Sequence, residues 1–210
     1  MAIRKSGLVK AQRHLSKSDP VLERLVADVG PCTLHFEPNR FAALARSIIS
    51  QQISTKAALA IRTRLEATMD GQGITPAGLL ALSDAALRGA GLSASKQKSL
   101  RDLAKHVHGN MVQLEAIHEL DDEEVITALL PVRGIGRWTA QMFLIFSLGR
   151  LDVLPVDDLG LRAAVQAHYR LRKVPDKARL TALAEPWRPY RSIATWYFWR
   201  SRGFVPQSGN

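Results

Sequence analysis

The sequence contains a single cysteine, Cys32, among its 210 residues. One thiol cannot form a disulfide within the chain, and it cannot supply a four-cysteine iron–sulfur or zinc site. The six histidines are scattered and offer no partners at metal-ligand spacing. Long apolar runs are also missing, so no segment has the length that a membrane span needs. These absences argue against a disulfide scaffold, a cysteine-ligated metal protein or a membrane-spanning protein, and they favour a reducing compartment.

Acidic residues are also scarce, with 19 Asp and Glu against 29 Lys and Arg, and the formal net charge is +10. Nucleic acid is the favoured partner of such a chain, because basic side chains release condensed counterions from phosphates. A basic surface that serves only solubility gives the same totals. An anionic membrane is the third option, but no long basic helix with a bare apolar face supports it. Residues 1–18 hold five Lys and Arg and no acid, which indicates a basic arm.

Helical periodicity dominates the rest of the chain, and only residues 32–36 hint weakly at a strand. Gly and Pro fall between the periodic segments, and Ser or Asp stands at several expected helix starts. The sequence therefore predicts an all-α protein, arranged as two lobes. The expected helices cover 21–29, 41–69, 95–107, 123–130, 137–148, 159–168, 177–184 and 188–202.

A glycine hairpin is predicted between two of these helices, in a unit of about 123–148 with Gly134 and Gly136 at its turn. Glycine allows the backbone to approach a ligand closely and to adopt dihedral angles that a Cβ opposes. The N–H groups at a helix start can then bind a phosphate. Thr139 adds a hydroxyl or N–H group at the same place. Lys96 and Lys98 are further candidates for phosphate contacts, although a solvated basic face explains them almost as well.

An acidic pair, Asp157-Asp158, stands at the expected start of the helix at 159–168. A helix N-terminus favours a negative charge, which suits a carboxylate that stabilises positive charge on a reacting group. The ordinary role of Asp before a helix is to cap it, and either residue can be only a cap. Spacing alone does not choose between the two acids.

Five motifs taken together resemble the helix-hairpin-helix DNA glycosylase superfamily, and most closely its 3-methyladenine DNA glycosylase II family. They occur in the family's order and span roughly residues 40–203. A lone Gly-x-Gly turn is weak evidence, but five ordered motifs are strong evidence. The motifs lie at 47–58, 91–98, 134–140, 154–158 and 186–192.

The resemblance implies base excision repair: a monofunctional glycosylase that hydrolyses the N-glycosidic bond of alkylated purines such as 3-methyladenine and 7-methylguanine. It implies Asp158 as the catalytic carboxylate, with Asp157 as the second candidate. Lyase relatives carry a lysine where this chain has Trp138, so an abasic site is the expected product. Trp138 and Trp199 are expected to line the base pocket and to favour a cationic ring. Met142 stands where relatives have a tyrosine, which leaves the pocket's shape open.

The resemblance also places the DNA wedge, which fills the gap left by a flipped nucleotide, at Gln52 or Ile53 within the long helix expected at 41–69. It implies no cofactor, with a structural monovalent cation at the hairpin carbonyls as an option. The expected lobes are 41–150 and 1–40 with 151–210, with a DNA-binding cleft between them.

The expected partner is double-stranded DNA with damaged bases, bound by a monomer without a membrane role. The expected location is the cytoplasm and nucleoid of a bacterium or the nucleus of a eukaryote. Two alternatives remain open: a glycosylase of the same fold for an etheno, deaminated or oxidised base, and a non-enzymatic helix-hairpin-helix protein that only binds DNA. A carboxylate and an aromatic box beside the hairpin favour an enzyme, since a pure binder has no need of them.

Overall fold

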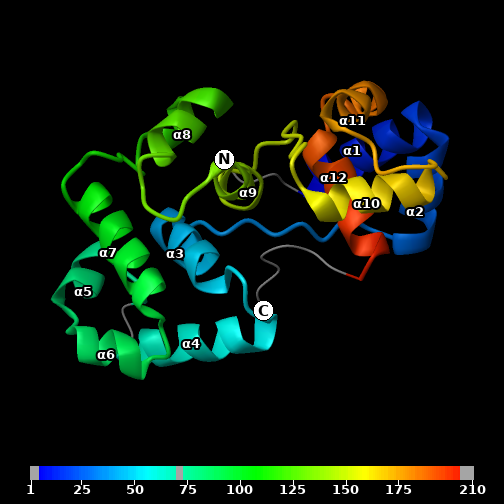
Figure 1. The fold of residues 1–210 in the computed structure, drawn as a ribbon. Coiled ribbons are helices and arrows are strands. Elements are labelled where there is room, and N and C mark those ends of the chain that lie inside the picture. Colours follow the sequence, from blue (N-terminus) through cyan, green and yellow to red (C-terminus); the bar gives the residue numbers. More distant parts are fainter. Residues whose placement is uncertain (1–4, 70–72, 204–210) are drawn as a thin grey trace. The chain divides into compact units, whose positions relative to one another are not determined.

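The computed structural model of the protein describes residues 5–69 and 73–203; residues 1–4, 70–72 and 204–210, which fall within the two expected lobes, lie outside this part. Every regular element of the described part is helical, with no strand, which confirms the all-α prediction (Figure 1). The α-helices are α1 (Lys5–Ser18), α2 (Pro20–Val29), α3 (Arg40–Ser50), α4 (Thr55–Ala67), α5 (Pro76–Ala81), α6 (Asp84–Gly89), α7 (Ala94–His108), α8 (Asp122–Leu129), α9 (Arg137–Phe146), α10 (Leu159–His168), α11 (Lys177–Leu183) and α12 (Arg191–Ser201), and short 3-10 helices lie at Ile117–Glu119 and Glu185–Trp187.

Contacts divide the described chain into two compact units. We call 37–143 the central unit, and the described residues of 1–36 and 144–208 the terminal unit. The central unit holds α3 to α8 and most of α9. The terminal unit holds the last residues of α9, together with α1, α2, α10, α11 and α12.

In the terminal unit, α12 packs against α1, α2 and α10 (Figure 1). Eight consecutive residues of α12, from Ser192 to Trp199, are buried, so this helix forms the centre of the unit. Asp19, itself buried, caps α2 and accepts a hydrogen bond from the indole of Trp187 at 3.0 Å. A buried carboxylate is tolerated here because backbone and side-chain donors satisfy it.

The expected basic arm is wrong for residues 5–18, which form helix α1. Leu8, Ala11 and Leu15 recur at helical spacing and are all buried, while Lys10, Arg13 and Lys17 are exposed. Residues 32–36 form no strand either. Cys32 and Leu34 are buried and Thr33 is exposed, so the alternation is real, but the segment pairs with no other strand in the described chain.

In the central unit, α7 packs against α3, α5 and α6, and α3 also packs against α4. Leu100, Leu103 and Ala104 supply the buried face of α7. The single helix expected at 41–69 is wrong: α3 ends at Ser50, and Ser54 caps the start of α4 by accepting a hydrogen bond from the Ala57 N–H at 3.2 Å. The break leaves residues 51–54 as an exposed turn rather than a helix interior.

Candidate active site and DNA-binding elements

Asp158 is the N-cap of α10, in the terminal unit, and its exposed fraction is 6%. Its backbone N–H donates to the Pro155 carbonyl at 2.9 Å, which closes a tight turn before the helix. Its Oδ1 atom accepts a hydrogen bond from the Leu161 N–H of the first helical turn. The helix start therefore orients the carboxylate and places it where the macrodipole favours negative charge.

A tryptophan from α12 holds the same carboxylate oxygen. The Nε1–H of Trp199 donates to Asp158 Oδ1 at 3.1 Å, and the indole stacks on Phe146, with ring centroids 5.9 Å apart. Gly160 leaves room for this pair, because a Cβ there would lie 3.2 Å from Asp158 Oδ1 and 3.8 Å from Trp199 Cδ1. The start of α10, the indole of Trp199 and the space at Gly160 together fix this one carboxylate. The sequence alone did not reveal the role of Gly160.

Asp157 has a different environment. Its side chain is 43% exposed, and its Oδ1 pairs with Lys177 Nζ at 2.6 Å, at the start of α11. An exposed ion pair of this kind is screened by solvent and does not hold a carboxylate in one orientation for chemistry. The geometry favours Asp158 where the spacing had left both acids open.

The segment that leads to Asp158 is anchored on the first turn of α12. Arg191 pairs with Asp152, with its Nε 2.8 Å from Oδ1 and its Nη2 2.9 Å from Oδ2. The Ser192 N–H donates to the Leu151 carbonyl at 2.9 Å, and the Ser192 hydroxyl accepts from the Val153 N–H at 3.0 Å. One helix therefore holds the 151–153 segment at its start and Asp158 near its end. The motif at 186–192 thus contacts the segment just before the motif at 154–158, a pairing that the sequence did not predict.

The glycine hairpin lies in the central unit, between α8 and α9. Gly134 has φ +83°, in the left-handed region, and a Cβ there would lie 2.8 Å from Ser99 Oγ. Both the dihedral angle and the space therefore require glycine. The Arg133 N–H donates to Asp102 Oδ2 at 2.8 Å, and the Ile135 N–H donates to the Val132 carbonyl at 3.0 Å.

Gly136 is exposed and directly precedes α9, whose first-turn N–H groups have no acceptor within the helix. A Cβ on Gly136 would meet no atom within 4 Å, so internal packing does not require glycine at this position. Thr139 is buried, with an exposed fraction of 5%, so its hydroxyl is not part of the exposed hairpin surface.

The three predicted pocket residues differ in exposure. Trp138 is partly exposed on the first turn of α9. Met142 lies one turn further along the same face and is fully buried. Trp199 is 1% exposed, so its ring is covered and its polar edge is committed to Asp158. Of these three residues, only Trp138 is partly exposed at the surface.

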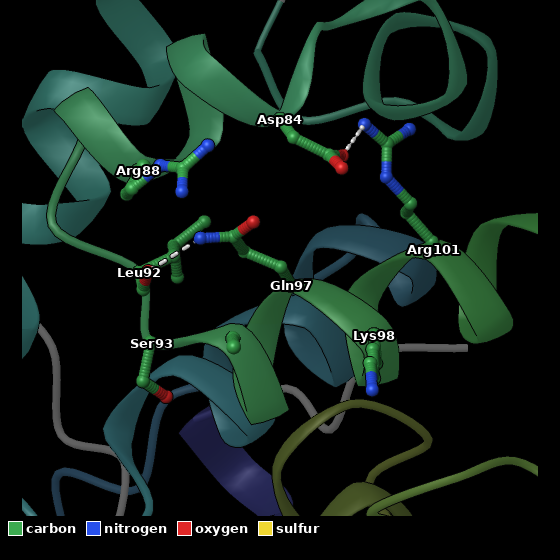
Figure 2. Close-up of a pocket in the computed structure, with 8 residues that line it drawn as sticks. Asp84, Arg88, Leu92, Ser93, Gln97, Lys98 and Arg101 are labelled. Carbon is green, nitrogen blue, oxygen red and sulfur yellow. Dashed lines mark hydrogen bonds and ion pairs between the residues drawn. The ribbon is translucent and has the colours of Figure 1, made fainter.

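The two predicted phosphate-binding lysines also differ in exposure. Lys96 is half-buried and donates from its Nζ to the Ile49 carbonyl at the end of α3, and burial lowers the pKa of its ammonium group. Lys98 is exposed and lines a hollow of about 400 Å³ on α6 and α7 together with Arg88. Figure 2 shows Arg101 at the edge of this hollow, paired with Asp84 at 2.7 Å. The hollow contains none of the predicted catalytic or pocket residues.

The turn between α3 and α4 carries the predicted wedge residues, Gln52 and Ile53. Both are exposed, and Gln52 has φ +58°, which is uncommon outside glycine. Gln51, which sequence reasoning did not single out, donates from its Nε2 to the Gly134 carbonyl at 2.8 Å. This bond joins residues 83 positions apart in the chain, so no local pattern could have revealed it.

Within the described residues, no helix is both long and apolar enough to cross a bilayer, and no group of three or more His, Cys, Asp or Glu side chains is arranged to share a metal ion. Of the hairpin carbonyls, that of Gly134 accepts from Gln51 and that of Val132 accepts from Ile135. Each of these carbonyl oxygens has a second lone pair, so its hydrogen bond does not prevent it from also binding a monovalent cation.

Comparisons with protein families and with known proteins agree with each other. Residues 45–189 match the family described as HhH-GPD superfamily base excision DNA repair protein. DNA-3-methyladenine glycosylase 1 of Schizosaccharomyces pombe is 38% identical over 205 residues, which cover 93% of this chain and 88% of that protein.

Two solved structures are similar over most of both chains. The Schizosaccharomyces pombe 3-methyladenine DNA glycosylase in complex with abasic DNA has a TM-score of 0.83 and 36% identity, covering 93% of this chain and 98% of that one. The DNA-3-methyladenine glycosidase of Bacillus halodurans has a TM-score of 0.82 and 36% identity, covering 92% and 89%.

Proposed function

The chain belongs to the HhH-GPD superfamily of base excision DNA repair proteins, and we propose that it is a monofunctional DNA glycosylase that releases alkylated purines from duplex DNA. The observation that carries the proposal is the fixed, buried carboxylate of Asp158, which Leu161 and Trp199 orient. The similar proteins are named DNA-3-methyladenine glycosylase and DNA-3-methyladenine glycosidase, and these names support the lesion class.

The target base must leave the helical stack before it can react, since its glycosidic bond is hidden in the duplex. The hairpin around Gly134 and Gly136 holds the phosphate backbone through its N–H groups, while exposed Lys98 adds positive charge. A side chain of the Gln52-Ile53 turn fills the gap in the stack. The net charge of +10 steers the protein to DNA and makes binding sensitive to salt.

Breaking the N-glycosidic bond builds positive charge on the deoxyribose, as in other oxocarbenium-like transition states. The Asp158 carboxylate stabilises this charge and orients the attacking water. An alkylated purine is a cationic and therefore better leaving group, so little acid catalysis is needed. The partly exposed indole of Trp138 favours a cationic ring through cation–π attraction.

Strand cleavage is not part of the proposed reaction. An amine nucleophile must attack the sugar to form the covalent intermediate of a lyase, and this chain has Trp138 where lyase relatives carry lysine. The neighbouring Arg137 remains charged and cannot serve as that nucleophile. We propose that the product is an intact strand with an abasic site, made by a monomer that acts on damaged DNA in a nucleoid or a nucleus.

The test is to incubate the purified protein with methylated duplex DNA and to chromatograph the released bases. Free 3-methyladenine or 7-methylguanine, with strands that remain unbroken until alkali is added, is the expected result. Strand breaks that form without alkali would contradict the monofunctional reaction. If no methylated base is released, duplexes carrying etheno, deaminated or oxidised bases would distinguish another glycosylase from a protein that only binds DNA.

A further inference from the structure

The turn that carries the wedge candidates and the hairpin that holds phosphate are joined by one side chain. We propose that Gln51 is a positioning residue: its amide ties the Gln52-Ile53 turn to the Gly134 hairpin, so that binding the DNA backbone also sets where the wedge enters the stack. This proposal rests on the proposed glycosylase function, because it concerns how the same DNA is opened.

The contact itself is specific. Gln51 is half-buried, and its Nε2 donates to the Gly134 carbonyl at 2.8 Å. The direction of that carbonyl is set by the left-handed backbone of Gly134, whose φ is +83°. A side chain without an amide donor at its end cannot make this bond, and a carboxylate of the same shape would repel the carbonyl oxygen. The amide is therefore the feature to test.

Both partners of this bond are fixed from a third element, helix α7. Lys96 donates from its Nζ to the Ile49 carbonyl at the end of α3, just before the turn. Ser99 lies against Gly134, and Asp102 accepts from the hairpin N–H of Arg133. Residues at spacings of three share one face of a helix, so 96, 99 and 102 present one side of α7 to both structures.

The turn itself is held at both ends. Gln51 anchors its first residue, and Ser54 caps α4 at its last residue. Between them Gln52 adopts φ +58°, a conformation that persists in a non-glycine residue when its surroundings determine it. The strained residue is exposed, as is Ile53 beside it. This is the arrangement expected of a tip that must keep its shape when it is pushed between base pairs.

The coupling explains why one bond between distant segments matters for function. Phosphates of a duplex are regularly spaced, so a wedge at a constant distance from a bound phosphate enters a constant step of the stack. Without the Gln51 bond the hairpin keeps its support from Ser99 and Asp102, but the turn loses its link to the hairpin. Loss of Gln51 should therefore affect the opening of DNA more than the binding of DNA.

The experiment compares Gln51→Met and Gln51→Glu with the matched control Gln97→Met. Gln97 also donates from its Nε2 to a backbone carbonyl, that of Leu92 at 2.7 Å, as Figure 2 shows, and this bond involves neither the turn nor the hairpin. The probe is a duplex with an abasic-site analogue beside 2-aminopurine, whose fluorescence rises when it is unstacked. Affinity for the same duplex is measured by anisotropy, and melting temperatures confirm that each variant folds.

We expect both Gln51 variants to bind within about twofold of the control. Their unstacking signal and single-turnover base release should fall by about three- to tenfold, the range of one net hydrogen bond. In a Gln52→Ala, Ile53→Ala background, Gln51→Met should cause no further loss, because no wedge remains to be positioned. If Gln51 had only a structural role, Gln51→Met would still lower the melting temperature in that background.

Two results would overturn the proposal: Gln51 variants that match Gln97→Met in unstacking, or variants whose binding falls as much as their unstacking. The abasic-analogue measurement does not require base release. If wild-type protein releases no base but the variants still differ in unstacking, the proposed function fails while the coupling stands.

Discussion

Replacing Gly160 with alanine should separate stability from activity. Gly160 lies in the first turn of α10 and has a backbone conformation open to any residue. At such a position Gly→Ala stabilises a protein by about 0.4–1 kcal/mol, chiefly because the unfolded chain loses freedom. The added Cβ, however, lies 3.2 Å from Asp158 Oδ1, so the carboxylate must yield by a few tenths of an ångström.

The expected cost in activity follows from that displacement. A misplacement of 1 Å near a reacting group can cost roughly 100-fold in rate, so a few tenths of an ångström corresponds to about three- to tenfold. The Asp158–Trp199 hydrogen bond, 3.1 Å long, is strained by the same shift. Gly160→Ala should therefore release base three- to tenfold more slowly at saturating enzyme, while its free energy of unfolding is unchanged or higher.

The control is Gly89→Ala. Gly89 also lies in a helix, as the last residue of α6, but a Cβ there would meet no atom within 4 Å. Urea denaturation and single-turnover base release are measured on both variants. Gly89→Ala should keep the wild-type rate. If Gly160→Ala releases base as fast as Gly89→Ala, the packing around Asp158 does not control the chemistry.

Three further predictions concern Asp157, Gly134 and Cys32. Asp157→Asn should remove the exposed pair with Lys177, change the free energy of unfolding by less than about 1 kcal/mol and leave base release intact; a large loss of activity would return Asp157 to the reaction. Gly134→Ala should lower stability by about 1–2 kcal/mol from its dihedral angle alone, and more from the clash with Ser99. Ser99→Ala removes Oγ but leaves Cβ 3.1 Å from the added methyl group, so in urea denaturation it should restore only part of the clash loss and none of the dihedral loss. Burial raises the pKa of the Cys32 thiol to about 12, so a thiol reagent at pH 8 should label it only when urea unfolds the chain, and rapid labelling of the folded protein would contradict its burial.

Local signals predicted helix boundaries well where a cap residue marks them. The helix expected at 159–168 begins and ends where it was placed, because Asp158 provides an N-cap directly before the apolar periodicity. The break after Ser50 was missed because no Gly or Pro marks it, and it depends on the left-handed backbone of Gln52. Ser54, an ordinary cap residue, was the signal present in the sequence.

The candidate site was predictable in its components but not in its contacts. Motifs identified Asp158, the hairpin and the wedge region, since each motif is a short run of residues. The bonds that organise them, such as Trp199 to Asp158 and Gln51 to Gly134, join residues 41 and 83 positions apart. Such pairings arise from tertiary packing, which periodicity and spacing do not encode. The same limit explains why the sequence did not predict the burial of Trp199.

The most direct test of the central claim is base release by Asp158→Asn. Asparagine keeps the size and most of the hydrogen bonding of the N-cap but removes the negative charge, so the protein should fold and bind damaged duplex with wild-type affinity. Base release from methylated DNA should fall by roughly 100-fold or more, as when a preorganised electrostatic group is removed from an active site. Release at the wild-type rate, with binding unchanged, would show that Asp158 only caps its helix and that the carboxylate of this reaction lies elsewhere.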